Sequence, residues 1–217
     1  MKKILSLASV VSLTCLLALL GTGCSPEAKK ARHLEQAERA YAAGDYDRAE
    51  IEYLNVLNVD AQNPAAIARL GSIYFEEGRI GRALPFLQKA RELTPNDPAV
   101  RAKTGLLSLA TGNFAEARKE ATFILEKNPA DAEAPIMLAE ASFKPEEIQA
   151  ARQQLEKLPT AESAPVLIGL GTLEMRQQHV DAAEALFKRA VAQDPQFAAA
   201  YAALGSLYRL KRDLPQA

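Results

Sequence analysis

Apolar residues recur at spacings of three and four in two runs within residues 64–97, and a short polar stretch separates the runs. The positions are Ile67, Leu70, Gly71 and Tyr74 in the first run and Ala83, Leu87 and Ala90 in the second. This spacing places each set on one face of a helix. The stretch Glu76-Glu77-Gly78-Arg79 lies between them, and Pro95 ends the pattern. The sequence therefore predicts a helical hairpin of 34 residues.

The same frame repeats along the chain, and a repeated unit of this period is typical of a helical solenoid. We predict units at about residues 30–63, 64–97, 98–131, 132–163, 164–197 and 198–217. The fourth unit is two residues short, and Lys144-Pro145 replaces its glycine turn. The sixth unit stops as its second helix should begin. From this we expect the sequence to be part of a longer array.

Small residues should let the two helices of a hairpin approach closely. We expect Gly71 and Ala83 to face one another across this seam, and Tyr74 and Leu87 to fill the space between hairpins. Because the last unit is incomplete, its apolar residues are expected to lack a helical partner. These are Tyr201, Leu204, Leu207 and Tyr208.

The pattern resembles the tetratricopeptide repeat (TPR) family. The residues that carry the match are Leu70, Gly71, Tyr74, Gly78, Ala83, Ala90 and Pro95, with equivalents in at least four other units. The resemblance implies an all-α fold, a right-handed superhelical solenoid of helix-turn-helix repeats, whose inner face comes mainly from the first helix of each unit. Leu34 and Glu38 stand where the family's clamp for a chaperone carboxylate needs Lys and Asn, so that activity is not supported.

Carried over by register, the resemblance gives a largely apolar groove for a peptide or helix, with a few charges. The residues are Leu34, Tyr41, Arg69, Phe75, Lys103, Leu106, Leu109, Ile136, Met137, Glu140, Phe143, Ile168, Met175, Arg176, Arg209 and Leu210. The alternative for each single residue is that it packs against an adjacent helix. For the face as a whole we favour binding.

Lys2, Lys3 and the apolar run 4–20 have the order of a secretory signal peptide, with a short transmembrane anchor as the alternative. The stretch Leu20-Gly21-Thr22-Gly23-Cys24 resembles the lipobox of bacterial lipoproteins. That resemblance implies a signal peptide over 1–23 and a lipid-modified Cys24. Residues 24–29 would then be a short lipidated tether, which holds the first repeat near the membrane. In a Gram-negative host, Ser25 favours the outer membrane.

Composition points away from several functions. The formal net charge is −1, and basic residues are interleaved with acidic ones, which argues against nucleic-acid binding. Neither histidine has a second histidine or cysteine at ligand spacing, so we expect no metal site. No phosphate loop or nucleophile elbow is present in the sequence. We therefore expect a protein that is not an enzyme and uses no cofactor.

Three hypotheses for function remain. The first is a membrane-anchored scaffold that presents a groove to protein or peptide partners on the periplasmic side of the cell envelope. The second is a structural subunit of an envelope assembly, or of an exopolysaccharide or protein export system. The third is the repeat part of a longer protein with another domain after residue 217.

Overall fold

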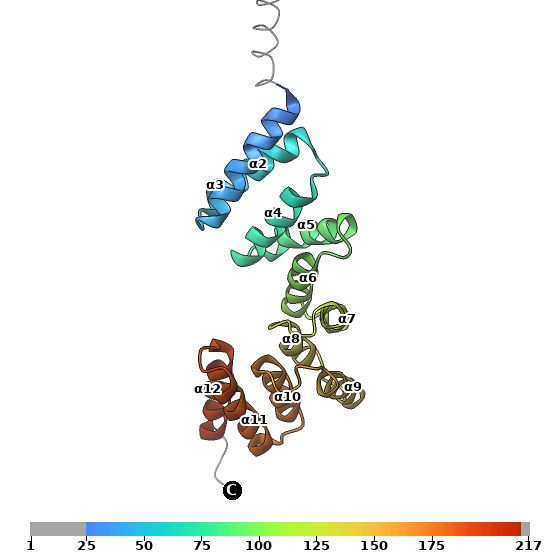
Figure 1. Ribbon diagram of the computed structural model, residues 1–217, viewed down its shortest axis with the longest axis vertical. Coiled ribbons are helices and arrows are strands. Elements are labelled where there is room, and N and C mark those ends of the chain that lie inside the picture. The colour runs from blue at the N-terminus through green and yellow to red at the C-terminus, as the bar shows by residue number, and fades with distance from the viewer. Residues whose placement is uncertain (1–24, 214–217) are drawn as a thin grey trace, which may run out of the picture. The chain divides into compact units, whose positions relative to one another are not determined.

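The structure is a computed structural model that describes residues 25–213 and the side chains of residues 25–211 (Figure 1). All regular secondary structure in this part of the chain is helical, which confirms the predicted all-α class. The helices are α2 (Pro26–Ala42), α3 (Tyr46–Val59), α4 (Pro64–Glu76), α5 (Ile80–Leu93), α6 (Pro98–Ala110), α7 (Phe114–Lys127), α8 (Ala134–Glu140), α9 (Pro145–Glu156), α10 (Ala164–Arg176), α11 (Val180–Gln193) and α12 (Ala198–Asp213).

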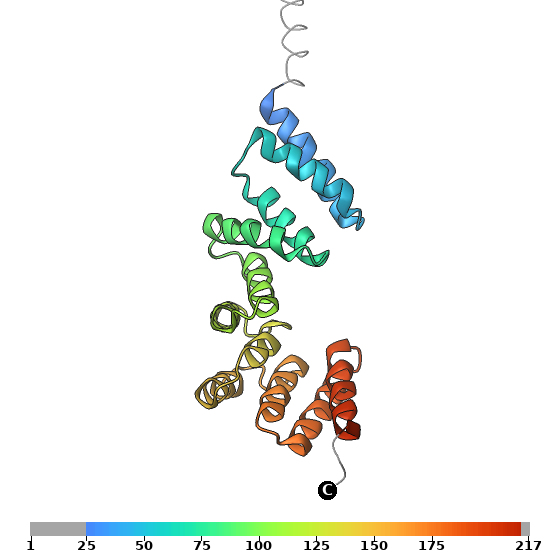
Figure 2. The same cartoon turned by 180° about the vertical axis from the view of Figure 1, so that it is seen from behind.

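The chain divides after Thr94 into two compact units, each described by itself. In the first unit, α2 pairs with α3 and α4 pairs with α5. In the second unit, α6 pairs with α7 and α10 with α11, while α12 packs against α11 and α10. Each pair is a hairpin joined by a tight turn, as the 34-residue period predicts (Figures 1 and 2).

Three of the first helices begin with the same chemistry, a polar cap followed by proline. The Ser25 hydroxyl accepts a hydrogen bond from the backbone N–H of Ala28 at 3.1 Å. Asn63 and Asp97 cap α4 and α6 in the same way, and each is followed by a proline. The N–H groups of a first turn have no acceptor within the helix, so a proline, which has no N–H, is well tolerated there. In the first unit, helix α2 therefore starts at Pro26. Residues 26–29 of the expected tether are the first residues of this helix.

The turns inside the hairpins depend on a backbone conformation that favours glycine. Gly44, Gly78 and Gly112, which are 34 residues apart, have φ values of 74°, 70° and 75°. The corresponding residue of the α10–α11 turn is Gln178, with a φ of 64°. Only a residue without a Cβ adopts this region at no steric cost. The glycine spacing thus locates three turns. In the α10–α11 turn, Gln178 adopts a backbone conformation that glutamine disfavours.

The two helices of a hairpin approach closely at the glycine of the first helix, and a large side chain of the second helix packs against it. A Cβ added to Gly71 would lie 2.8 Å from Cγ and Cδ2 of Leu87 on α5. In α10 and α11, a Cβ on Gly171 would overlap the ring of Phe187. The atoms nearest to a Cβ on Gly71 belong to Leu87, which we had expected to fill the space between hairpins, so this large side chain also packs inside the hairpin.

The hairpin of α8 and α9 is irregular, as the shortened fourth repeat predicts. Helix α8 has only seven residues, and Pro145 starts α9. The Glu147 carboxylate accepts hydrogen bonds from the backbone N–H groups of Phe143 and Lys144, at 3.1 and 3.2 Å. It therefore satisfies two donors at a turn that has no glycine.

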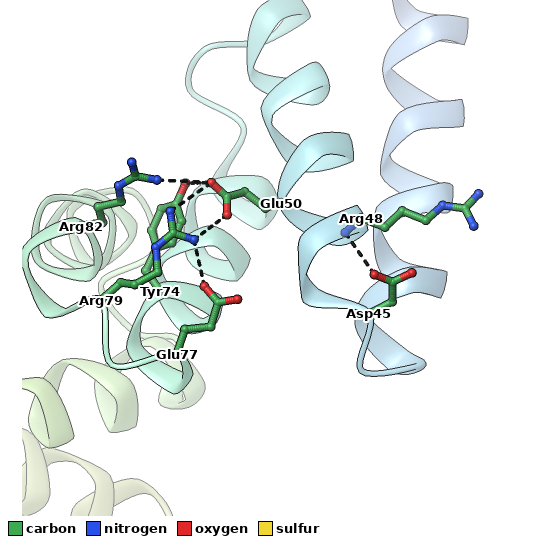
Figure 3. A network of polar contacts seen from close by, with 7 residues as sticks. All are labelled: Asp45, Arg48, Glu50, Tyr74, Glu77, Arg79 and Arg82. Atoms are coloured by element: carbon green, nitrogen blue, oxygen red, sulfur yellow. Dashed lines mark hydrogen bonds and ion pairs between the residues drawn. The ribbon is translucent and has the colours of Figure 1, made fainter.

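Neighbouring hairpins within a unit are joined by polar contacts from one repeated position, which we call the clasp position. It is the residue after the buried alanine of a second helix. Helix α5 has Leu84 at this position, and the other second helices carry Glu50, Arg118, Arg152 and Glu184. Glu50 on α3 accepts hydrogen bonds from Tyr74 at 2.9 Å and Arg79 at 2.7 Å (Figure 3). The Arg79 guanidinium also lies 4.6 Å from the centre of the Tyr74 ring.

The other clasps use the same position with different charges. Arg118 pairs with Glu147 at 2.8 Å, and Arg152 pairs with Glu174 at 2.7 Å. Glu184 accepts hydrogen bonds from Tyr208 at 3.1 Å and Lys211 at 2.5 Å, which ties α11 to α12. Hydrogen bonds from two lysine side chains, from Lys188 and then from Lys211, lower the pKa of Glu184 to about 2.

Candidate functional site

An apolar hollow of about 370 Å³ lies in the second unit, between α8, α10 and α12. Helix α10 contacts both α8 and α12, and it lies between them in both views (Figures 1 and 2). The lining residues from α8 and α10 are Ile136, Glu140, Ile168, Thr172 and Met175. Four of these five, all but Thr172, are residues that the register assigns to the groove. The structure therefore brings part of the predicted face together.

The opposite wall of the hollow is made of small residues. Ala199, Ala202, Ala203 and Ser206 lie at spacings of three and four along α12, so they share one face of that helix. Leu207 and Phe187 complete the lining and are buried. Because the α12 face carries almost no side-chain volume, space remains above Ile168 and Met175.

Glu140 is the acidic residue of this lining. Glu140 is exposed at the surface. Partial desolvation raises the pKa of its carboxyl group, and the positive charge of Arg176 opposes that effect. Among the side chains of residues 25–211, none donates a hydrogen bond to the Glu140 carboxylate or forms an ion pair with it. The hollow thus presents one carboxylate without a direct partner beside an apolar surface.

Arg176 is held away from that carboxylate by two other contacts. Its guanidinium lies 3.9 Å from the centre of the Phe143 ring and donates to the backbone oxygen of Glu140 at 3.1 Å. The Phe143 ring is 43% exposed and packs against Phe114, with ring centres 4.5 Å apart. Arg176 and Phe143, both assigned to the groove from sequence, therefore form a stacked edge next to Glu140.

Other predicted groove residues of the second unit are placed differently. Met137 is only 1% exposed, and its sulfur lies against Gly105, so its assignment to a groove surface was wrong. Leu106 and Leu109 are half-buried against the core of α7–α10, and Lys103 is also half-buried. Arg209 is exposed and donates to the Ser206 hydroxyl at 3.1 Å, while Leu210 is 41% exposed.

The apolar residues of α12 also differ from expectation. Leu207, predicted to lack a helical partner, is 1% exposed and belongs to the core formed with α10 and α11. Tyr201 and Tyr208 remain 51% and 41% exposed. Leu204 is half-buried and packs against the same core. Two of the four residues therefore contribute to packing within the unit.

In the first unit, the predicted residues Tyr41 and Arg69 form part of a satisfied polar cluster. Arg69 donates to both carboxylate oxygens of Glu38, at 3.3 and 3.2 Å, and its guanidinium lies 4.4 Å from the Tyr41 ring centre. The Tyr53 hydroxyl donates to the same carboxylate at 2.8 Å, and its pKa is raised by burial and by that bond. Leu34 and Phe75 are half-buried. This cluster stabilises the packing of α2, α3 and α4.

Sequence reasoning missed Thr172, Phe187 and the small-residue face of α12. The available signal was the run of alanines over residues 198–203, interrupted only by Tyr201. Four small residues at helical spacing on a first helix predict a helix face with space beside it. From the register we had assigned only large or charged side chains to the groove.

Within residues 25–213 there is no group of three metal-ligating side chains, and none of the helices there is long and apolar enough to cross a membrane. The predicted lipid-modified residue, Cys24, and the predicted signal peptide over 1–23 lie outside the described residues.

Comparison with known proteins identifies the class. Tetratricopeptide repeat models match residues 40–107, 108–165 and 168–217. Together they cover most of the sequence, and the chain belongs to the tetratricopeptide repeat family.

Part of this chain is similar to part of longer proteins. DnaJ homolog subfamily C member 3 from Rattus norvegicus is 30% identical over 113 residues, and the human protein of that name is 29% identical. The match covers 52% of this chain and 22% of each relative.

Solved structures show the same fold at low identity. A tetratricopeptide repeat protein from Parabacteroides merdae gives a TM-score of 0.67 at 19% identity, over 84% of this chain and 73% of that one. MamA from Desulfovibrio magneticus gives 0.64 at 18% identity, over 78% of this chain and 97% of that one. Repeats of this family mediate protein–protein interaction, so the hollow is a candidate site for a protein segment.

Proposed function

We propose that this chain is a membrane-anchored interaction scaffold of the bacterial cell envelope, facing the periplasm, which binds protein or peptide partners and catalyses no reaction. The observation that carries the proposal is the apolar hollow between α8, α10 and α12, in which four residues assigned to the groove from sequence lie together. Apolar surfaces of this kind bind helices or extended segments by burying their side chains.

The proposed anchor rests on the N-terminal sequence. Cys24 follows a segment with the order of a lipoprotein signal, and acyl chains on that cysteine would hold the protein at a membrane. Helix α2 begins at Pro26, two residues after this cysteine, so a lipid at Cys24 would keep the first repeat near the bilayer surface.

The anchor is tested by replacing the cysteine in the full-length chain. We expect wild-type protein made in a Gram-negative host to partition into the detergent phase of a phase-separating detergent, and to carry acyl groups on Cys24 by mass spectrometry. The variant Cys24→Ser should move to the aqueous phase. Equal partitioning of the two proteins would overturn the anchor and leave the binding role to be judged separately.

The binding role is tested by site-specific photo-crosslinking in cells. A photoreactive amino acid at Ala202, which lines the hollow, should capture a defined segment of a protein partner that mass spectrometry maps. The same probe at Ala185, an exposed residue of α11, is the matched control. The substitution Ala203→Arg, which fills the hollow, should abolish the crosslink while the thermal melt shows a folded protein. Equal crosslinking from both positions would argue against this surface.

A further inference from the structure

The hollow of the second unit combines a long apolar wall with one carboxylate at its edge. Ile136, Ile168 and Met175 provide the wall, and Glu140 provides the charge. We propose that this hollow receives a lysine or arginine side chain of the partner segment, with the aliphatic stem along the apolar wall and the cationic end at Glu140. This inference rests on the proposed function and names the chemistry of its ligand.

The carboxylate is chemically suited to an external cation. Glu140 is exposed, so a ligand can reach its carboxylate, and no side chain of residues 25–211 donates to it. Partial desolvation of this carboxyl group raises its pKa. A donor from a ligand would restore the interactions that the charged form lacks, and charge-assisted hydrogen bonds are the stronger ones. The protein's own nearby cation does not fill this role, because Arg176 is stacked on Phe143 and bonded to a backbone oxygen.

The apolar wall fits the rest of such a side chain. Lysine and arginine carry three or four methylenes below the charged group, and these stems bury well along apolar surface. The small residues Ala199, Ala202 and Ala203 leave room for a chain of that length opposite Ile168. A glutamate in the same place would put two carboxylates together, which disfavours an acidic partner.

The test uses the full chain and peptide libraries of defined chemistry. Four libraries of amidated nine-residue peptides have randomised flanks of alanine, leucine, serine and phenylalanine. Their central residues are lysine, arginine, norleucine or glutamate. Norleucine has the length of lysine without its charge, so the comparison isolates the cation. The most retained lysine peptide is then measured by fluorescence anisotropy against wild-type protein and its variants.

We expect the lysine and arginine libraries to be retained most, and the chosen peptide to bind Glu140→Gln about tenfold more weakly than wild type, the effect of losing one charge-assisted hydrogen bond. The matched control is Glu156→Gln, which removes one exposed acid of α9 and should leave affinity unchanged. A Glu140→Lys variant should prefer the glutamate library.

The other outcomes separate this inference from the proposed function. Equal retention of the lysine and norleucine libraries, with binding lost in Ala203→Arg, overturns the cation and leaves an apolar binding hollow. A tenfold loss in both glutamine variants shows a general charge effect and overturns the role of Glu140. No retention of any library overturns the inference together with the binding role. Self-association of the chain at the same surface, measured by sedimentation, assigns the hollow to a second copy and also overturns the inference.

Discussion

Replacing one of two helical glycines in the same hairpin should measure how tightly α4 and α5 pack. Gly71 lies on α4, where a new Cβ would come within 2.8 Å of Leu87 Cγ and Cδ2 and 3.1 Å of the Leu87 backbone nitrogen. Gly81 lies on α5, where a new Cβ would meet nothing within 4 Å. The two Gly→Ala variants change the same atoms in the same kind of helix, so they differ in the space available.

The expected free energies follow from two opposing terms. Alanine is a better helix former than glycine by about 1 kcal/mol inside a helix, and Gly81, in the first turn of α5, gains at most that amount. At Gly71 the methyl group is closer to Leu87 than ordinary van der Waals contact allows, and overpacking of this kind costs about 1–3 kcal/mol. Gly81→Ala should therefore be up to about 1 kcal/mol more stable than wild type, and Gly71→Ala up to about 2 kcal/mol less stable.

The assay is thermal unfolding followed by circular dichroism at 222 nm. For a chain of this length, about 1 kcal/mol corresponds to about 2–4 °C in Tm, so Gly71→Ala should melt at least about 2 °C below Gly81→Ala. Equal Tm values for the two variants would refute the close approach of α4 and α5 at Gly71.

A double-mutant cycle identifies the partner residue. Leu87→Ala removes the Cγ and Cδ2 atoms that the new methyl group would meet. In that background Gly71→Ala should be neutral or stabilising, even though Leu87→Ala alone is destabilising. If Gly71→Ala costs the same with and without the Leu87 side chain, then Leu87 is not the residue that limits this position.

The remaining predictions concern a turn and a clasp. Gln178→Gly should stabilise the protein by about 0.5–1 kcal/mol, because Gln178 has a φ of 64°. The control Gln177→Gly, at a position with a φ of −93°, should not stabilise it. Unfolding in urea measures the free energy of unfolding of both variants. Glu184 has a folded-state pKa of about 2, below its ordinary value of 4.5. Its stabilising contribution is therefore complete above about pH 4.5 and is lost as the pH falls towards 2. Glu184→Gln should therefore lower Tm at pH 7 and reduce the acid-induced drop in Tm between pH 5 and 2. An unchanged acid profile would contradict that assignment.

The sequence was sufficient for the repeat frame because the frame depends on local chemistry. Gly78 and its equivalents mark turns that need a positive φ, and Asn63 with Pro64 marks a helix start. Both signals act within a few residues, so neither depends on tertiary contacts. The same reasoning predicted the irregular fourth hairpin from Lys144-Pro145, and Pro145 does start α9.

The packing partners and the hollow were less predictable, because periodicity gives the face of a helix but not the residue opposite. The side chain nearest to Gly71 is that of Leu87, and Met137 is buried in the core against Gly105. The hollow exists because α12 has no large side chains on this face, and the side chains of Ala199 and Ala203 are too small to fill it. The missing partner of Glu140 follows from the stacking of Arg176, which spacing alone does not reveal.

The charge at the clasp position determines which neighbouring hairpin a repeat can pair with. Glu50 and Glu184 present acids to the next hairpin, whereas Arg118 and Arg152 present bases to Glu147 and Glu174. A hairpin exchanged between an acidic and a basic clasp would meet a group of its own charge, although its backbone would still stack. The repeats of this chain are therefore not interchangeable. An array with its repeats reordered would lose the ion pairs and hydrogen bonds between hairpins, although its helices would still form.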